Sequence, residues 1–360
     1  MKQDPFKEYI KEGEPGKREK AYIWSTAIGL QAVDNLETSE YLKDTAIRNI
    51  EGQISMKEAN ELLERYYEES EIHVTKEIDR TEEADKVSAR IALLLSERSF
   101  SFTPNEYLSI HRKLFTGIYP HAGQIRTYNI TKKEWVLDED TVIYGSASEL
   151  QATLQYDFMQ ENHFSYKGLN TDEIISHLAF FISRLWQIHV FGEGNTRTTA
   201  VFLIKYLRTL GFDVINDVFA ENAWYFRNAL VRANFSDLTR GIYESCEYLE
   251  LFLRNLMLNE HNPLQNRTLH IRSEVFKEKK PDIDIEKPDI ADAFLPKTAG
   301  HVLILKESFS DEVFSRKDVI RVLGLKKSRA SDLIKQMAEK GMIEAVRGSG
   351  KGKYRFRHSL

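Results

Sequence analysis

The chain has 360 residues, of which 42% are hydrophobic and 29% are charged, and it contains one cysteine. This length predicts two or three domains, and the composition excludes a disordered chain. No apolar run approaches the length of a membrane span, and the first twenty residues lack the apolar stretch of a secretion signal. A single cysteine cannot form an internal disulfide. We therefore expect a cytoplasmic protein with no membrane partner.

The charge is distributed unevenly along the chain. The whole sequence has a formal net charge of −5, with 50 basic and 55 acidic side chains. Residues 297–360 hold 15 basic and 7 acidic side chains, whereas the rest of the chain holds 35 and 48. A basic module on an acidic body indicates an anionic partner for the smaller part.

The first third of the chain predicts helices. Apolar residues at helical spacing favour an amphipathic helix over 54–70, and its expected inward side chains are Ala59, Leu62, Leu63 and Tyr66. Further helices are expected over 40–52, 84–97 and 104–116. Residues 123–145 are instead rich in Ile, Thr, Tyr, Val and Trp, with Lys132 and Lys133 at a turn. This composition predicts a β-hairpin inserted between helices.

The middle of the chain contains the strongest helical pattern. Residues 171–188 are apolar nearly all round, which is typical of a core helix, so His177 within it is interpreted as a packing residue. A second apolar helix is expected over 196–210, and further helices near 219–234 and 241–258. Residues 274–297 carry three prolines and many charges without periodicity, which predicts a linker.

The loop between the two apolar helices, residues 189–197, brings together groups that suit phosphate chemistry. Two nearby glycines and the start of the following helix predict an anion-binding cradle, with Asn195 and Thr196 as capping residues. Glu193 is a hard oxygen ligand of the kind that Mg²⁺ uses beside phosphates. His189 can remove a proton near neutral pH, and Arg197 adds a cation in the first helical turn.

This loop resembles the signature of the Fic family, which reads His, any, Phe, any, Asp/Glu, Gly, Asn, Gly/Lys, Arg, two others, Arg. The matching residues are His189, Phe191, Glu193, Gly194, Asn195 and Arg197. Residues 110–130 resemble the helix and flap that precede the signature, and residues 224–235 resemble the helix that follows it. The resemblance covers residues 40–258.

The resemblance implies transfer of AMP from ATP to a Ser, Thr or Tyr hydroxyl of a protein. His189 would deprotonate the hydroxyl, Glu193 would hold Mg²⁺, and Arg197 would stabilise the leaving pyrophosphate. The implied phosphate cradle comprises Gly192, Gly194, Asn195 and Thr196. The implied adenine contacts are Tyr225 and Asn234. The implied flap residues, which would align the target by strand addition, are Arg126, Thr127, Tyr128, Asn129 and Ile130.

The sequence departs from the family pattern in ways that bear on the donor and on regulation. Ala200 replaces the second signature arginine, so the donor could be held differently or could be another phosphate compound. Glu51 resembles the glutamate of the family's inhibitory helix, although Ile47 replaces the expected Ser/Thr. Glu51 is thus either an inhibitory group, placed against Arg197, or a solvated residue before the next helix.

The basic tail predicts a second domain. Residues 314–325 and 326–341 favour two helices, followed by a strand, a glycine-containing turn and a second strand. This order resembles the winged helix-turn-helix class of DNA-binding domains. The expected DNA contacts are Lys326, Lys327, Ser328, Arg329, Arg347, Lys351 and Lys353. The alternative is a winged domain that contacts only proteins.

We therefore predict a mainly α protein, with a helical Fic core, a β-hairpin flap and a C-terminal α+β winged-helix domain. The predicted parts are an N-terminal helical region (1–98), the core (99–264), a linker (265–296) and the winged domain (297–360). Three functions stay open: an AMP transferase, a nucleotide-sensing transcriptional regulator with little transferase activity, and a transferase of a different nucleotide or a phosphate group. A homodimer is one candidate for the oligomeric state.

Overall fold

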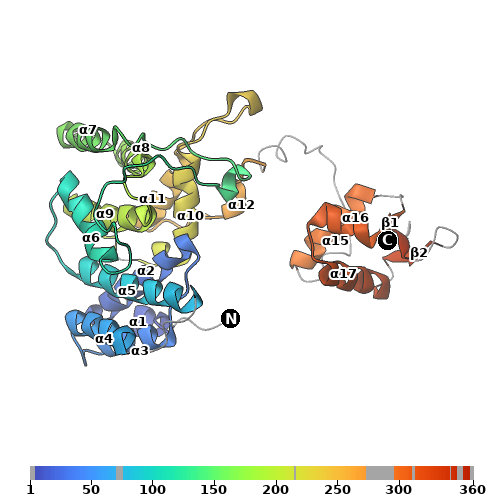
Figure 1. Ribbon diagram of the computed structural model, residues 1–360, viewed down its shortest axis with the longest axis horizontal. Helices are drawn as coiled ribbons and strands as arrows, with labels where there is room; N and C mark the ends of the chain where they lie inside the picture. The colour runs from blue at the N-terminus through green and yellow to red at the C-terminus, as the bar shows by residue number, and fades with distance from the viewer. Residues whose placement is uncertain are drawn as a thin grey trace. The chain divides into compact units, whose positions relative to one another are not determined.

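The computed structural model describes residues 5–69, 76–214, 216–272, 296–309, 313–340, 342–346 and 352–356. The chain forms two compact units, Met1–Lys279 and Lys280–Leu360 (Figure 1). Within the described residues, no helix has both the length and the apolar character needed to cross a membrane. Most of the predicted linker, residues 274–295, lies outside the described residues.

The first unit is helical. Its N-terminal half contains α1 (Lys7–Glu12), α2 (Pro15–Gly29), η1 (Leu30–Asp34), α3 (Glu40–Ile50), α4 (Met56–Glu69) and α5 (Lys76–Ser96). Its second half contains α6 (Pro104–Phe115), η2 (Trp135–Leu137), α7 (Leu150–His163), α8 (Thr171–Ile188), α9 (Asn195–Thr209), α10 (Val218–Arg232), η3 (Leu238–Arg240), α11 (Glu247–Leu258) and α12 (Asn266–Leu269). One hydrophobic core joins both halves, from Phe6 to Ile271.

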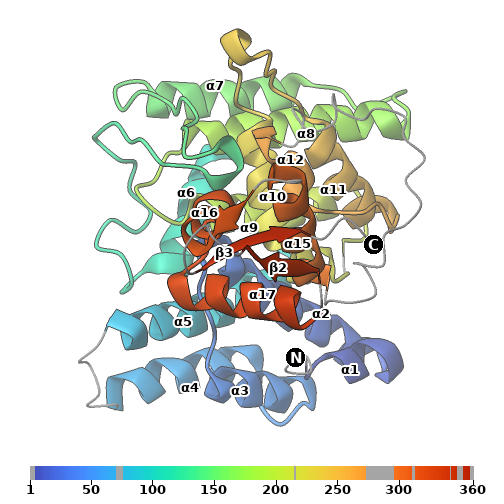
Figure 2. The same ribbon diagram turned by 90° about the vertical axis from the view of Figure 1, so that its right-hand side faces the viewer.

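Helix α9 occupies the centre of this unit. Every residue from Asn195 to Leu207 is buried, including polar ones. Figures 1 and 2 show α9 and α10 between the paired helices α7 and α8 on one side and α2 to α5 on the other. The start of α9 is therefore fixed by contacts with several helices, and this is where the predicted phosphate loop ends.

Helix α8 confirms the strongest sequence prediction. It begins with a capping box in which Asn170 is the cap and Glu173 closes the box, so Thr171 is the first helical residue. His177 is a satisfied packing residue, as predicted. Its Nε2 lies 2.6 Å from Glu161 Oε2, and its ring stacks on Phe164 with centroids 3.3 Å apart.

Helix α4 was predicted correctly, but one of its inward side chains was not. Tyr66 is 40% exposed and stacks on Tyr41. Tyr67 is buried instead, and its hydroxyl donates to Asp85 Oδ2 at 2.7 Å. The buried acceptor on α5 selects which of two adjacent tyrosines faces inward, and no local pattern in α4 reveals that acceptor.

The second unit comprises α15 (Pro296–Phe309), β1 (Phe314–Ser315), α16 (Arg316–Leu323), α17 (Lys327–Glu339), β2 (Ile343–Ala345) and β3 (Lys353–Phe356). The strands form an antiparallel sheet in the order β1-β3-β2, in which Phe314 pairs with Tyr354 and Ile343 with Phe356. Ser315 caps α16 through a capping box with Asp318. The buried residues of α17 are Ala330, Leu333, Ile334 and Met337.

Candidate functional site

The predicted phosphate loop joins α8 to α9 through two left-handed residues. His189 ends α8 with φ 50° and ψ 59°, and Gly194 precedes α9 with φ 75°. A side chain at Gly194 would also collide with the core, because an added Cβ would lie 2.5 Å from Phe115 Cε2. A left-handed non-glycine residue is costly and is found where the surroundings impose it, often at functional sites.

Asn195 and Phe191 hold the loop in shape. The Phe191 N–H donates to Asn195 Oδ1 at 3.0 Å, and Asn195 Nδ2 donates to the Phe191 carbonyl at 2.8 Å. Thr196 Oγ1 accepts from Trp186 Nε1 at 3.0 Å. The prediction that Asn195 and Thr196 cap α9 is wrong, because Gly194 is the cap and both side chains bond elsewhere. Backbone N–H groups at the start of α9 are thus the groups suited to an anion.

His111 on α6 also supports the loop, and sequence reasoning gave it no role. Its Nε2 lies 3.0 Å from the Glu193 carbonyl oxygen, and the Gly123 N–H donates to its Nδ1 at 2.8 Å. The ring stacks on Phe191 with centroids 3.7 Å apart. Burial lowers the pKa of His111 to about 3. The neutral ring therefore accepts at Nδ1 and donates at Nε2, and it joins α6, the Gly123 turn and the loop.

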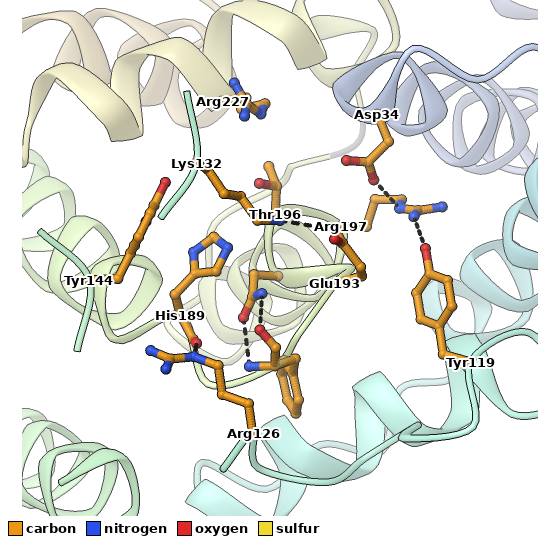
Figure 3. Close-up of polar contacts among 12 residues, drawn as sticks. Asp34, Tyr119, Arg126, Lys132, Tyr144, His189, Glu193, Thr196, Arg197 and Arg227 are labelled. Carbon is orange, nitrogen blue, oxygen red and sulfur yellow. Dashed lines mark hydrogen bonds and ion pairs between the residues drawn. The ribbon is translucent and has the colours of Figure 1, made fainter. Parts of the chain in front are cut away.

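The His189 side chain is buried without a hydrogen-bond partner. It is 4% exposed and lies between the rings of Tyr144 and Trp186. Neither ring nitrogen has a partner among the described residues. Burial lowers the pKa of His189 well below its ordinary value, and the charges of Lys132 and Arg126 lower it further. The imidazole is consequently neutral at neutral pH, with a free lone pair (Figure 3).

Glu193 is the exposed carboxylate of the loop. Its Oε2 lies 3.0 Å from Lys132 Nζ, and the two side chains are 55% and 28% exposed. Within the described residues, no three potential metal-ligating side chains of His, Cys, Asp or Glu gather. A single carboxylate fits the way Mg²⁺ binds beside a nucleotide, where phosphate oxygens and water supply the other ligands.

Arg197 lies on the other side of the start of α9 from His189 (Figure 3). It is fully buried, and its guanidinium stacks over the Phe115 ring. Its polar partners are Asp34 Oδ2 at 2.8 Å, Glu83 Oε1 at 2.6 Å, Gln31 Oε1 at 3.0 Å and the Tyr119 hydroxyl at 3.1 Å. Burial alone would lower the pKa of Arg197, but the nearby carboxylates outweigh it and raise the pKa. The phosphate contact expected of Arg197 would have to compete with two carboxylates.

The predicted β-hairpin is not present: within residues 123–145 the structure has no strand, and the turn is the 3-10 helix η2. The first arm bonds both to the phosphate loop and to the second arm, where the Glu134 N–H donates to the Asp140 carbonyl at 2.9 Å. The Arg126 N–H donates to the Val190 carbonyl at 2.9 Å, and its guanidinium donates to the carbonyls of His189 and Gly145. The bonds to Val190 and His189 fix the first arm to the loop, and the two arms form no strand ladder. We keep the name flap for residues 123–145.

The flap residues expected to align a target lie beside the loop. Thr127, Tyr128 and Asn129 are exposed, and Ile130 is partly buried. Asn129 Oδ1 accepts from the Ala147 N–H at 2.8 Å. An added Cβ at Gly192 would lie 2.6 Å from the Tyr128 hydroxyl, so the flap closely approaches the loop there.

A buried ion pair fastens the flap to α10. Glu134 is 1% exposed, Arg227 Nη1 lies 2.6 Å from Glu134 Oε2, and the Tyr144 hydroxyl donates to Oε1 at 3.0 Å. Sequence reasoning gave neither charged residue a role, because a single Glu in a loop and a single Arg on a helix carry no local signal. The pair fixes the arm that bears Lys132.

The other predicted site residues are packed or lie elsewhere. Tyr225 is 1% exposed, and Asn234 donates from Nδ2 to the carbonyls of Ser183 and Leu230, so the adenine contacts stay predictions. Glu51 is not brought to Arg197. Its carboxylate bonds to Lys17 and Tyr9, and these bonds lower its pKa.

The predicted DNA contacts lie in the second unit. Lys326, Lys327, Ser328 and Arg329 are exposed at the start of α17. Lys353 lies on β3 and is partly buried. Arg347 and Lys351 lie outside the residues that the structure describes.

Comparison with known proteins gives a family for the central part of the chain. Residues 101–207 match the family described as Fic/DOC, so the chain contains a Fic/DOC domain. This match confirms the resemblance seen in residues 189–197 and includes α6, the flap, α8 and most of α9.

Two curated relatives are named as adenylyltransferases. The chain is 26% identical over 174 residues to the protein adenylyltransferase VbhT of Bartonella schoenbuchensis, covering 45% of this chain and 35% of that protein. It is 27% identical over 132 residues to a probable protein adenylyltransferase of Sinorhizobium fredii, covering 37% of this chain and 65% of that protein. The matches thus span less than two thirds of either relative.

Two solved structures are also similar. A Fic family protein from Desulfovibrio desulfuricans is 14% identical, with 96% of this chain and 97% of that chain covered and a TM-score of 0.39. A Fic domain containing signaling protein from Bacteroides thetaiotaomicron is 15% identical, with 72% and 100% covered and a TM-score of 0.39.

Proposed function

We propose that this chain is a protein adenylyltransferase, which transfers AMP from ATP to a Ser, Thr or Tyr hydroxyl of a protein. The observation that carries this proposal is the His189 imidazole, which is neutral, buried and without a partner at the start of a phosphate-type loop. The Fic/DOC match and the names of the two relatives support the same reaction class.

The proposed reaction is a direct displacement at the α-phosphorus. His189 accepts the proton of the target hydroxyl, and the oxygen attacks as the bond between the α-phosphorus and the bridging oxygen breaks. Pyrophosphate leaves, and AMP stays on the protein as a phosphodiester. Backbone N–H groups at the start of α9 bind the phosphate oxygens, and Glu193 would hold Mg²⁺. When bound, Mg²⁺ would offset part of the triphosphate charge.

The test compares His189→Ala with the wild type and with His163→Ala, a control that removes an exposed histidine. Each protein is incubated with Mg²⁺, cell lysate and ATP labelled at the α-phosphate. We expect His189→Ala to lose labelling by about a hundredfold or more, since general bases contribute on the order of 10²–10⁴. His163→Ala should label as the wild type does.

Three other outcomes would remove the role of His189 or select another candidate function. Equal labelling by His189→Ala and wild type would remove the proposed role of His189. If no ATP-dependent label appears at all, and nucleotide instead changes DNA affinity, the chain is a nucleotide sensor. Labelling from α-labelled UTP, CTP or GTP, and not from ATP, would mean that the donor is another nucleotide and that the reaction class is unchanged.

For the second unit, we propose that α17 contacts DNA as the recognition helix of a winged helix-turn-helix domain. The supporting observations are the order of helices and strands and the exposed cations Lys326, Lys327 and Arg329 at the start of α17. Helices of this class contact base edges and phosphates with their first residues. The net positive charge of residues 297–360 favours the same partner.

The DNA proposal is tested on the full chain with a duplex at two salt concentrations. Changing Lys326, Lys327 and Arg329 together to Gln should weaken binding about tenfold or more, and should reduce the slope of log affinity against log salt by about 2–3. Lys335→Gln on the same helix is the control. A triple variant that binds as the control does would remove α17 as the DNA-binding element.

A further inference from the structure

The phosphate loop lacks the free arginines that the Fic signature would provide. Ala200 stands at the position of the second arginine and is fully buried. Arg197, at the first position, is fully buried between Asp34 and Glu83. The negative charge of a triphosphate tail requires cationic partners. If this chain binds such a donor, the cation has to come from another element.

Three basic side chains lie on the opposite side of the loop from Arg197 (Figure 3). Figure 3 shows Lys132, Arg126 and Arg227 on the His189 side of the loop, and their charges add to the effect of burial in lowering the pKa of His189. Arg126 is not available to bind a phosphate, because its guanidinium donates to the carbonyls of His189 and Gly145 and the residue is 5% exposed. These bonds hold the flap to the loop.

Arg227 is also committed to a structural contact. Both of its terminal nitrogens bond to the buried carboxylate of Glu134, and its guanidinium lies over the Trp224 ring. Separating a buried ion pair leaves an uncompensated charge, which is strongly unfavourable. Arg227 therefore keeps Glu134 and does not serve as a mobile phosphate ligand.

Lys132 differs from both arginines. The only side-chain partner of its ammonium among the described residues is Glu193 Oε2, at 3.0 Å, and both side chains reach solvent. An exposed ion pair of this kind is weak and exchanges readily. Figure 3 shows the Lys132 side chain beside the His189 imidazole, with its ammonium directed at Glu193. A lysine ammonium is also a common phosphate ligand, acting as a point charge.

We propose that Lys132 is the phosphate-binding cation of this site, in place of the second arginine of the signature. When the donor binds, its ammonium exchanges Glu193 for a phosphate oxygen. The exchange leaves the Glu193 carboxylate free for the Mg²⁺ that we propose it holds. This inference rests on the proposed function, and it assigns a binding role to the flap in addition to target alignment.

The test measures equilibrium binding of α,β-methylene-ATP, which cannot transfer AMP, in the presence of Mg²⁺. Lys132→Met is compared with the wild type and with Lys133→Met, which removes the adjacent exposed lysine. We expect Lys132→Met to raise Kd about tenfold and Lys133→Met to change it by less than about twofold. Lys132→Arg, which keeps the charge, should recover most of the affinity.

Adenosine binding separates a phosphate contact from general damage to the site. Adenosine has no phosphate, so its Kd should be the same for wild type and Lys132→Met. The Lys132 assignment is overturned if Lys132→Met binds the triphosphate analogue as tightly as Lys133→Met does, or if it weakens adenosine equally. If wild type binds neither compound, the proposed function fails as well, so the two failures are distinguishable.

Discussion

His189 and Arg197 begin and end the same nine-residue loop, yet their surroundings are opposite. The His189 imidazole is buried with no partner on either nitrogen, and burial, together with the nearby cations, keeps it neutral. The Arg197 guanidinium is buried with two carboxylates, an amide and a hydroxyl around it. A buried polar group without a partner costs stability, whereas a fully paired one fastens neighbouring elements together. The loop thus carries an imidazole that is free to accept a proton at one end, and at the other end a guanidinium that joins neighbouring elements.

The largest expected effect comes from removing the charge of Arg197, which is paired with two carboxylates. Arg197→Met leaves Asp34 and Glu83 together without their cation, and we expect it to lower the free energy of unfolding by about 3–5 kcal/mol. Urea unfolding, followed by circular dichroism, measures this. The control is Arg254→Met, which removes a surface ion pair with Asp172 and should change stability little.

The same variant also tests the division of roles. If Arg197→Met is as stable as the Arg254→Met control and loses affinity for α,β-methylene-ATP, then Arg197 is a phosphate ligand as the Fic resemblance implies. The contrast between the two ends of the loop would then be wrong.

A smaller effect is expected from the loop's two glycines. Gly194→Ala must adopt φ 75° and place a Cβ against the core ring of Phe115, so we expect a loss of about 2–3 kcal/mol. Gly192→Ala meets the Tyr128 hydroxyl, the far end of a side chain that is 56% exposed and can move away, and approaches His121 Nε2 at 3.2 Å. We expect a loss below about 1 kcal/mol there, within the range of tolerated substitutions.

Urea unfolding of the two glycine variants side by side sharpens the comparison. Equal losses would mean that the flap is as rigid as the core at this point. A large loss for Gly192→Ala alone would place the rigid contact on the flap side and contradict the difference described above.

The sequence predicted the elements whose apolar spacing is strong. Helices α8 and α9 and the loop between them were identified, because a helix that is apolar nearly all round leaves few alternatives. Helix α7 received no prediction. Its buried residues form only a narrow stripe, Leu150, Leu154, Phe158 and Glu161, and one of them is charged.

The errors arise where distant contacts decide the structure. The β-branched and aromatic residues of 123–145 favour strands locally, but the Arg126 N–H bonds to Val190 in the loop between α8 and α9, and the Gly145 N–H bonds to Gln187 of α8. Likewise, Glu83 is 114 residues from Arg197 in the chain and Gln31 is 166 residues away. No spacing rule connects such residues, so the partners of Arg197 could not be predicted from the motif.

The complete burial of α9 from Asn195 to Leu207 has a practical consequence for redesign. A helix with no solvent-facing side offers no position where a substitution is free of packing cost. Libraries aimed at a new donor or acceptor would therefore be placed on the exposed flap positions Thr127, Tyr128 and Asn129, with α9 kept constant.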